Sequence, residues 1–267
     1  MSRSDGLKKR RPKTNITMKK LIAANWKMNK NAKDAVSYAK ELKKLAKSSD
    51  AEIVICPPFT LLSAVAGELK GSNIKLGAQN MHFEDSGAFT GEISSLMLKE
   101  IGCEYVILGH SERREHFSED NVMINRKVSA ALKNGLKPIL CVGETLEEKQ
   151  HERTEDVLEE QLLKCLDGVK EIKNVAIAYE PVWAISKGDP NKKSAAKADA
   201  EEAHLFIRQV LDGIYGDDAK SVRIIYGGSM KPENAKELLE MHQINGGLVG
   251  NASLDVKSFF EIIKNAK

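Results

Sequence analysis

One stretch of the chain joins a buried strand to a candidate catalytic group: Val175-Ala176-Ile177-Ala178-Tyr179-Glu180-Pro181-Val182. The apolar run at its start has the length and composition of a buried strand, and Glu180 stands at the end of that run. The stiff Pro181 follows, and Trp183-Ala184-Ile185 then leads into a segment rich in Gly, Ser, Ala and Lys. A carboxylate at a strand end, below a loop that can close, suits a general base shielded from water.

Apolar runs of this kind recur along the chain and alternate with helix-length segments. Residues 34–47 place their apolar side chains on one helical face and most of their lysines elsewhere, and residues 145–165 and 199–212 show similar patterns. Such alternation indicates βαβ units and a parallel sheet, and eight units in about 250 residues suit a closed (β/α)8 barrel. The eight runs centre near Ile22, Val54, Leu76, Val106, Ile139, Ile177, Ile224 and Val249.

The predicted barrel is a single α/β domain over residues 19–267. An open, doubly wound sheet is the alternative arrangement, but no G-x-G-x-x-G motif follows a strand, which weighs against a dinucleotide-binding fold. The 267 residues are 42% apolar, enough for a sizeable core. No apolar run approaches the roughly 20 residues of a membrane span, so we expect no membrane association.

The four cysteines indicate a reducing compartment. They show no paired spacing typical of a metal site, and two of them end apolar runs that resemble buried strands. We expect reduced thiols in a cytoplasmic protein and no bound metal. The cysteines are Cys56, Cys103, Cys141 and Cys165.

A basic extension precedes the barrel. Positions 1–17 hold six basic residues against Asp5, a net charge of +5, so the +3 of the whole chain leaves −2 for the rest. With almost no apolar residue to bury, residues 1–18 are predicted to be disordered. Lys8-Lys9-Arg10-Arg11 suits a targeting or polyanion-binding arm; alternatively the extension has no function, or translation begins at Met18. The mildly acidic remainder has no basic face that would indicate a nucleic-acid partner.

Polar residues directly after the strands are the candidates for chemistry, because barrel active sites lie where strands end. Asn25 and Lys27 follow the first run, and His110 follows the fourth. A helix that starts at Ser111 would point its backbone N–H groups at the imidazole and keep His110 neutral. Taken singly, Lys27 is equally explained as a solvated rim charge, His110 as a structural residue, and Glu180 as the partner of an arginine.

Two glycine-rich turns follow the last two strands and precede helices: Tyr226-Gly227-Gly228-Ser229 and Leu248-Val249-Gly250-Asn251-Ala252-Ser253. Backbone N–H groups of such turns bind phosphate, and the loops after strands seven and eight are a frequent phosphate site in barrel enzymes. Either turn alone is also explained as an ordinary tight turn. The pair predicts a phosphorylated substrate.

With these residues assembled, the chain closely resembles the triosephosphate isomerase family from about Lys20 to its C-terminus. The resemblance implies the (β/α)8 TIM barrel and a cofactor-free, metal-free interconversion of dihydroxyacetone phosphate and D-glyceraldehyde 3-phosphate in glycolysis and gluconeogenesis. Seven segments carry it, in the order of the family: Ala24–Asn29, Gly77–Asn80, Gly87–Ser94, Gly109–Arg114, Cys141–Glu144, Ala178–Ile185 and Tyr226–Ser229.

The resemblance also implies roles for individual residues. Glu180 is the general base, and His110 is the neutral electrophile that polarises the carbonyl and moves a proton between the two oxygens. Lys27 supplies positive charge, Asn25 assists at the oxyanion, and Glu112 positions Lys27. The implied phosphate contacts, largely through backbone N–H groups, are Ser186, Ser229, Gly250 and Asn251.

Members of this family are usually homodimers, and Gln79–Ile93 resembles their protruding interface loop. Thr90 would then lie near the catalytic Asn25 and Lys27 of the other subunit. The apolar members Met81, Phe83 and Phe89 would be unusual on a monomer surface. A loop folded back on its own barrel is the alternative.

The chain departs from the family at two places. Where the family's closing loop continues with Gly-Thr-Gly-Lys, this chain has Ser186–Lys193, about four residues longer, with a Cβ at Ser186 where a positive φ would be costly. The longer loop would close more slowly or bring lysines over the phosphate, or it is simply an extended tip. Asn251 replaces a second glycine, tolerates a left-handed conformation, and predicts slightly weaker substrate binding.

Two other functions compete with isomerisation of triose phosphates. A catalytically dead barrel relative could act as a binding protein through its basic extension, and a different aldose–ketose isomerase could use a similar barrel. The complete set of Asn25, Lys27, His110 and Glu180 opposes a dead relative, since such a protein would be free to lose any of them. The combination of strand-end residues around His110 and Glu180 opposes another isomerase.

Overall fold

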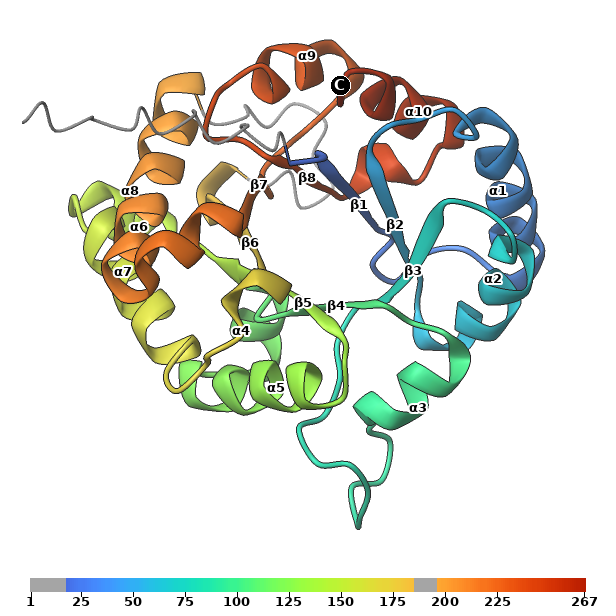
Figure 1. Cartoon of the computed structure of the whole chain (residues 1–267), viewed down its shortest axis with the longest axis horizontal. Coiled ribbons are helices and arrows are strands. Elements are labelled where there is room, and N and C mark those ends of the chain that lie inside the picture. The colour runs from blue at the N-terminus through green and yellow to red at the C-terminus, as the bar shows by residue number, and fades with distance from the viewer. Residues whose placement is uncertain (1–17, 185–195) are drawn as a thin grey trace, which may run out of the picture.

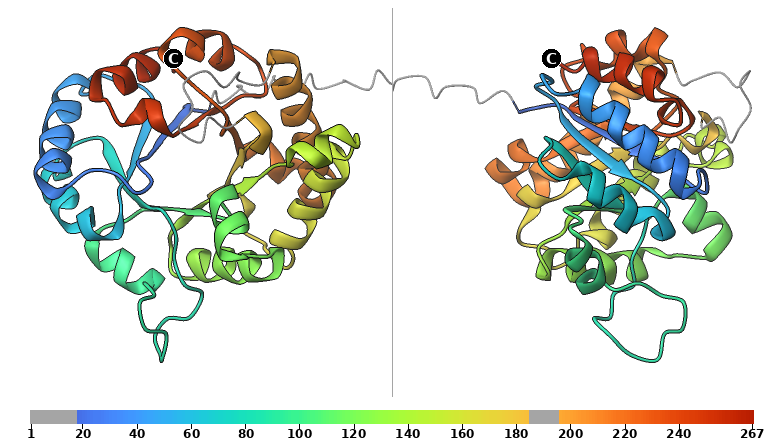
Figure 2. Two further views of the ribbon diagram at one scale, coloured as in Figure 1. Left: turned by 180° about the vertical axis from the view of Figure 1, so that it is seen from behind. Right: turned by 90° about the vertical axis from the view of Figure 1, so that its right-hand side faces the viewer.

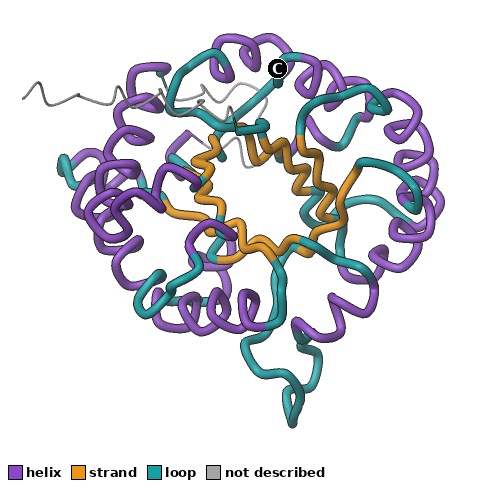
Figure 3. Tube along the Cα trace, viewed as in Figure 1, coloured by secondary structure: helices purple, strands orange, loops and turns teal. Residues whose placement is uncertain are grey.

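The computed structural model describes residues 18–184 and 196–267. Within these ranges eight parallel strands form a closed barrel in chain order, with β8 hydrogen-bonded to β1 (Figures 1 and 3). The predicted (β/α)8 fold is confirmed, and the open-sheet alternative is wrong. The strands are β1 (Leu21–Asn25), β2 (Glu52–Cys56), β3 (Ile74–Ala78), β4 (Tyr105–Leu108), β5 (Lys137–Val142), β6 (Ala176–Tyr179), β7 (Arg223–Tyr226) and β8 (Gly246–Val249).

Helices cover the outside of the barrel on all sides (Figure 3). In the described part of the chain they are α1 (Ala32–Leu45), α2 (Leu62–Leu69), α3 (Ser95–Ile101), α4 (Ser111–Phe117), α5 (Asn121–Lys133), α6 (Leu146–Gln150), α7 (Thr154–Cys165), α8 (Lys197–Tyr215), α9 (Pro232–Leu239) and α10 (Val256–Lys264). Short 3-10 turns lie at Phe59–Leu61, Ile172–Asn174, Val182–Ala184, Gly216–Ser221 and Asn251–Ser253. The predicted basic extension lies outside the described residues except for Met18, and the domain boundary at residue 19 stays a prediction.

Local sequence explains where the helices begin and end. The Asn31 side chain caps α1 by accepting a hydrogen bond from the Asp34 N–H at 3.0 Å. Residues 145–165, predicted as one helical pattern, form two helices instead, because the chain turns at Glu152, whose φ is 57°. That left-handed conformation interrupts the run of helical hydrogen bonds.

Two layers of apolar side chains stabilise the barrel. Leu21 and Ala23 of β1 pack in the barrel interior with side chains such as Val54 and Ile107, whereas Ile22, the residue between them, packs in the layer beneath the helices. Because successive side chains of a strand point to opposite faces, each strand contributes to both layers. Both faces of the sheet are therefore covered, which explains why the strands read as continuous apolar runs.

A cluster of charged and polar side chains closes the N-terminal end of the barrel. The Tyr105 hydroxyl donates to Glu52 Oε1 at 2.6 Å, and Arg223 donates both to Glu52 and, at 2.9 Å, to the Tyr105 hydroxyl. Burial would raise the pKa of Glu52, but the Tyr105 hydrogen bond and the Arg223 charge outweigh it and hold this pKa below its usual value. We call these three residues the basal triad.

The segment between β3 and α3 projects away from the barrel (Figure 2). Its base is anchored on α5, where Arg126 lies 3.1 Å from Glu84 and over the ring of Phe83. Phe89 near the tip is 42% exposed, but Met81 is fully buried in its own chain. Met81 therefore gives no support to a contact with a second subunit, because its side chain packs under the helices with the rest of the outer core.

The helices and the cysteines agree with the expectations from the sequence about membrane spans and reduced thiols. No helix in the described ranges is long and apolar enough to cross a membrane. All four cysteines are buried as free thiols, as predicted.

Candidate active site

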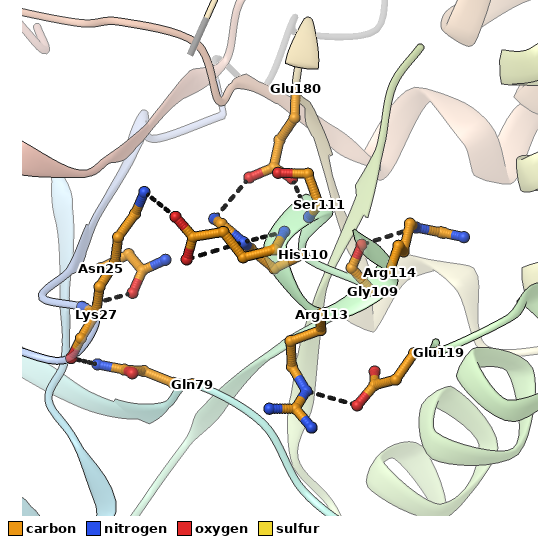
Figure 4. Close-up of polar contacts among 11 residues, drawn as sticks. Asn25, Lys27, Gln79, Gly109, His110, Ser111, Arg113, Arg114, Glu119 and Glu180 are labelled. Atoms are coloured by element: carbon orange, nitrogen blue, oxygen red, sulfur yellow. Dashed lines mark hydrogen bonds and ion pairs between the residues drawn. The ribbon is translucent and has the colours of Figure 1, made fainter. Parts of the chain in front are cut away.

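A cavity of about 510 Å³ opens at the C-terminal end of the strands. Asn25, Lys27, His110 and Glu180 line it, so the structure brings together four strand-end residues from three separate parts of the chain. Asn25 ends β1, His110 comes two residues after β4, and Glu180 follows β6 directly. Figure 4 shows these side chains converging.

Glu180 is held from both sides by backbone groups. Its N–H donates to the Val142 carbonyl of the neighbouring strand at 2.7 Å, and its carboxylate accepts from the Ser111 N–H at 2.9 Å. Glycines make room for it: a Cβ at Gly143 would lie 1.8 Å from the Glu180 carbonyl oxygen, and one at Gly227 would lie 2.7 Å from Glu180 Cγ. The carboxylate is 98% buried by this surrounding chain and still faces the cavity.

His110 lies between Glu180 and the start of α4. Its Nδ1 accepts a hydrogen bond from the Glu112 N–H at 3.2 Å, which confirms that a helix beginning at Ser111 points its amides at the ring. Since Nδ1 is the acceptor, the proton of a neutral ring sits on Nε2. Nε2 lies 3.1 Å from Glu180 Oε1 and is the hydrogen-bond donor that faces the cavity.

Lys27 adopts a left-handed backbone conformation with φ of 51°. Two side chains hold it there: its N–H donates to Asn25 Oδ1 at 3.0 Å, and its carbonyl accepts from Gln79 Nε2 at 2.9 Å. Such a conformation is costly for a residue with a Cβ and persists only where neighbours hold it. The strained turn after β1 directs the lysine side chain into the cavity.

Glu112 binds the ammonium group of Lys27, with Oε1 2.6 Å from Nζ. Burial would raise the pKa of Glu112, but the hydrogen bond and the positive charge of Lys27 outweigh it and hold this pKa below its usual value. The predicted proximity of Glu112 to Lys27 is therefore present in the structure.

Both glycine turns contribute to the lining of the cavity. Ser229, Gly250 and Asn251 all line it. Asn251 begins a 3-10 turn, and its φ is not positive, so the left-handed conformation considered for this residue is not adopted. Ser186 lies outside the described residues, as does the departing loop Ser186–Lys193.

Three further residues support the site without having been singled out from the sequence. Gln79 holds the Lys27 carbonyl, and Arg114 donates to the Gly109 carbonyl at 2.9 Å. Glu144 accepts hydrogen bonds from Trp183 Nε1 at 2.6 Å and from the Tyr179 hydroxyl at 3.1 Å. Its full burial raises its pKa, although these hydrogen bonds oppose the shift. A signal for Glu144 was present, because it follows an apolar run just as Glu180 does.

A buried ion cluster lies below the site at the root of the projecting segment. Glu119 accepts from Lys127 Nζ at 2.6 Å and pairs with Arg113, and Lys127 also donates to Asn80 at 3.0 Å. Figure 4 shows Arg113 and Glu119 beside the site. The cluster links the segment after β3 to α4 and α5. In the described ranges no group of three or more His, Cys, Asp or Glu side chains has the arrangement of a metal site.

Comparisons with known proteins agree on one family. The family model described as triosephosphate isomerase matches residues 20–266. A triosephosphate isomerase of Carboxydothermus hydrogenoformans is 52% identical over 252 residues, which are 93% of this chain and 99% of the relative. One from Alkaliphilus oremlandii is 49% identical over 248 residues, 92% and 98% of the two chains. The crystal structure of triosephosphate isomerase from Bartonella henselae superposes with a TM-score of 0.86 at 41% identity, over 93% of this chain and 99% of that one.

Proposed function

Because this chain belongs to the triosephosphate isomerase family, we propose that the cavity at the C-terminal end of its barrel is where the family's reaction takes place. The chain is an isomerase that interconverts dihydroxyacetone phosphate and D-glyceraldehyde 3-phosphate by proton transfer through an enediolate. One observation carries the assignment of the site. The Glu180 carboxylate lies 3.1 Å from His110 Nε2, in a cavity that Lys27 and both glycine turns also line.

Glu180 is the general base. Its carboxylate is held by the Ser111 N–H and faces His110, so a substrate must draw it away from these donors before it can reach the carbon next to the carbonyl. The backbone contact to Val142 keeps the main chain fixed while the side chain moves. Because the side chain is almost fully buried, few waters compete for the proton that it removes.

His110 donates its Nε2 proton to the substrate oxygens. The N–H of Glu112 occupies Nδ1, and the N-terminus of α4 disfavours a cationic ring, so the neutral imidazole is the donor. A donor aimed at the place where negative charge develops stabilises the enediolate.

Lys27 supplies fixed positive charge to the enediolate and the phosphate. Glu112 and the strained backbone turn position it, and Asn25 both holds that turn and lines the cavity beside the oxyanion. The phosphate binds where the two glycine turns line the cavity, at Ser229, Gly250 and Asn251, with Ser186 as a further contact from outside the described residues. No metal or organic cofactor takes part in this mechanism.

The two alternative functions, a dead relative and another sugar-phosphate isomerase, are less consistent with the site. A dead relative would have no reason to retain the strained Lys27 turn beside an intact Glu180–His110 pair. A different sugar-phosphate isomerase is disfavoured because family relatives match over more than 90% of this chain.

The decisive experiment is a coupled isomerase assay on the full chain and on Glu180→Gln. Loss of the base should lower kcat by about 10³-fold or more, while circular dichroism and the midpoint of thermal unfolding stay near wild type. The exposed Glu240→Gln serves as control and should retain full activity. Near-full activity of Glu180→Gln would refute the mechanism. A chain that begins at Met18 should remain active, because every residue assigned a role in this mechanism lies after Met18.

We further propose that the protein is a homodimer joined through Gln79–Ile93. The base of this loop is anchored on α5, while Phe89 near its tip stacks on His82 and is still 42% exposed, so a second subunit would bury it further. The loop tip would then bring Thr90 toward the cavity of the other subunit. The free, buried thiols suit a cytoplasmic protein.

Light scattering tests the dimer. The native chain should have about twice its 29.5 kDa mass at micromolar concentration, and Phe89→Arg should shift it toward the single-chain mass because a cation at the loop tip cannot be buried in the interface. Leu205→Arg, on the exposed face of α8, introduces the same charge and should leave the mass unchanged. A dimer that survives Phe89→Arg would exclude this loop as its main contact.

A further inference from the structure

The loop after β1 contains a second lysine in a left-handed conformation, Lys30, with φ of 73°. In the described part of the chain four residues other than glycine have a positive φ, and two of them, Lys27 and Lys30, lie in this loop. Such a conformation is costly for a residue with a Cβ and persists only where neighbours hold it. Lys27 has a place in the proposed site, whereas Lys30 does not line the catalytic cavity. The strain at Lys30 therefore needs an explanation of its own.

Three contacts hold the half-buried side chain of Lys30. Its Nζ donates to the Leu254 carbonyl at 2.7 Å. The same atom lies 5.1 Å from the centre of the Trp26 ring and 4.6 Å from the centre of the Tyr38 ring. The faces of aromatic rings attract cations, so the two rings keep the ammonium group where it reaches the chain after β8.

Tyr38 of α1 binds the residue before Leu254. Its hydroxyl donates to the carbonyl of the fully buried Ser253 at 2.7 Å. Its ring packs edge to face against Trp26, with the ring centres 4.9 Å apart. Two successive carbonyls after β8 are therefore bound by side chains that lie 215 and 224 residues earlier in the chain.

These two carbonyls end the turn that is proposed to bind the phosphate. Within the turn, the Ser253 N–H and hydroxyl donate to the Gly250 carbonyl at 2.8 and 2.7 Å. The Leu254 N–H donates to the Asn251 carbonyl at 3.0 Å. Gly250 and Asn251 line the catalytic cavity, and a Cβ at Gly250 would lie 3.6 Å from Lys27 Cε. Because internal hydrogen bonds make the turn one unit, holding its last two carbonyls also sets the direction of the N–H groups at its start.

We propose that Lys30 is a positioning residue for the phosphate group of the substrate and acts through the turn at residues 250–254. With Tyr38 it holds the turn in place before the substrate arrives, so less binding free energy is lost in ordering the turn. The inference rests on the proposed function, which assigns the phosphate to this turn. It adds a residue that sets the preference for a phosphorylated over an unphosphorylated substrate without touching either.

Attraction between the charge of Lys30 and the phosphate is the alternative, and it would need no contact with Leu254. Burial lowers the pKa of Lys30, and the negative charges of Asp34 and Asp255 oppose this shift. These carboxylates also offset the positive charge that a distant phosphate would experience. The two explanations differ in their response to salt, because added salt screens separated charges but has little effect on a buried contact.

Two substrates that differ only in the phosphate separate positioning from general damage to the site. Lys30→Met keeps an apolar stem and removes the ammonium group. It should lower kcat/KM for D-glyceraldehyde 3-phosphate at least fivefold more than kcat/KM for D-glyceraldehyde, whose slow isomerisation is followed by NMR, because only the first substrate uses the turn. Lys30→Arg still carries donors for the Leu254 carbonyl and should restore the ratio of the two constants to within twofold of wild type.

Equal losses of kcat/KM on the two substrates, or no loss on either, would overturn the role of Lys30. Circular dichroism and the midpoint of thermal unfolding establish that each variant is folded. The proposed function is judged separately, because it fails if the wild type does not isomerise D-glyceraldehyde 3-phosphate or if Glu180→Gln keeps near-full activity.

Calorimetric binding of sn-glycerol 3-phosphate tests the same contact without catalysis. Its Kd should rise at least fivefold in Lys30→Met, and the ratio to the wild-type Kd should persist at 0.5 M KCl. Lys33→Met removes an exposed lysine of α1 as the matched control and should bind within twofold of wild type. A ratio that falls to one at high salt would show a general effect of charge and would overturn positioning.

The hydroxyl of Tyr38 provides an independent test of the turn. Tyr38→Phe keeps the ring beside Lys30 and should raise the Kd for sn-glycerol 3-phosphate at least twofold. In the double variant Lys30→Met/Tyr38→Phe, the increase should be smaller than the product of the two single increases, because both side chains hold one turn. A Kd unchanged by Tyr38→Phe, or increases that multiply, would contradict the proposal.

Discussion

The two ends of the barrel use the same kinds of residue for different purposes. At the N-terminal end, Glu52, Tyr105 and Arg223 bind one another across three strands that are not neighbours. At the C-terminal end, Glu180 and His110 also lie within hydrogen-bond distance, but both face a cavity of about 510 Å³. Each end thus has a largely buried glutamate beside a nitrogen donor. At the C-terminal end the pair lines a cavity with space for a third molecule.

The difference teaches how a barrel separates stability from chemistry. In the basal triad the carboxylate is satisfied by permanent partners, and its lowered pKa means that its interactions stabilise the folded state. At the catalytic end the Glu180 carboxylate is held by donors that a substrate can replace. Substitutions at the two ends should therefore change different quantities. Glu180→Gln should remove isomerase activity and leave the free energy of unfolding unchanged, whereas substitutions in the basal triad should lower the free energy of unfolding and leave activity unchanged.

The largest stability effect is expected for Arg223→Met, which removes the arginine partner of the mostly buried Glu52 carboxylate and leaves it the Tyr105 hydroxyl and the more distant Lys137. The free energy of unfolding should fall by about 2–4 kcal/mol, while kcat and KM stay within about twofold of wild type. Urea unfolding at fixed protein concentration and the coupled assay measure the two quantities. Lys137→Met is the control, because Lys137 is more exposed and lies 3.9 Å from Glu52, and it should cost less than about 1 kcal/mol. A large loss of activity in folded Arg223→Met would contradict the proposal that the basal triad affects stability and leaves catalysis unchanged.

A pH series with Glu52→Gln sharpens the same comparison. Because the folded-state pKa of Glu52 lies below its unfolded value, the stability it contributes is complete above the unfolded pKa of about 4.3 and is lost as pH falls through the lower folded pKa. Wild type should exceed Glu52→Gln by a constant margin between pH 6 and 8, and the margin should shrink below pH 4. Urea unfolding at each pH measures it, and a margin that grows on acidification would show that the charge of Glu52 does not stabilise the fold.

The smallest expected effect is at the phosphate wall of the catalytic end. Asn251 is exposed and lines the cavity, so its side chain can crowd the phosphate while its backbone N–H still binds it. Asn251→Gly should lower KM about twofold without changing stability beyond the small entropic cost of a glycine. Steady-state kinetics with D-glyceraldehyde 3-phosphate measure this. An unchanged or higher KM would remove Asn251 as the reason for weaker binding.

Features set by neighbouring residues could be read from the sequence. The eight apolar runs correspond to the eight strands, and residues at or after the ends of five of them, β1, β4, β6, β7 and β8, line the cavity. The helix at Ser111 and its effect on His110 were also predictable, because the start of a helix depends on a few adjacent positions. The single helix expected over 145–165 was not found, since a left-handed turn at Glu152 gives no clear apolar or glycine signal.

The sequence by itself thus determined which groups stand at the strand ends, because strand period and turn chemistry are local. Only the tertiary structure decided which of them meet. The contact between Glu52 and Arg223 joins positions 171 residues apart, and Gln79 holds Lys27 across 52 residues. Met81, which the sequence places in the predicted interface loop, is buried by packing with other parts of its own chain. Such pairings depend on how the barrel closes, and closure is a property of all eight strands together rather than of any one of them.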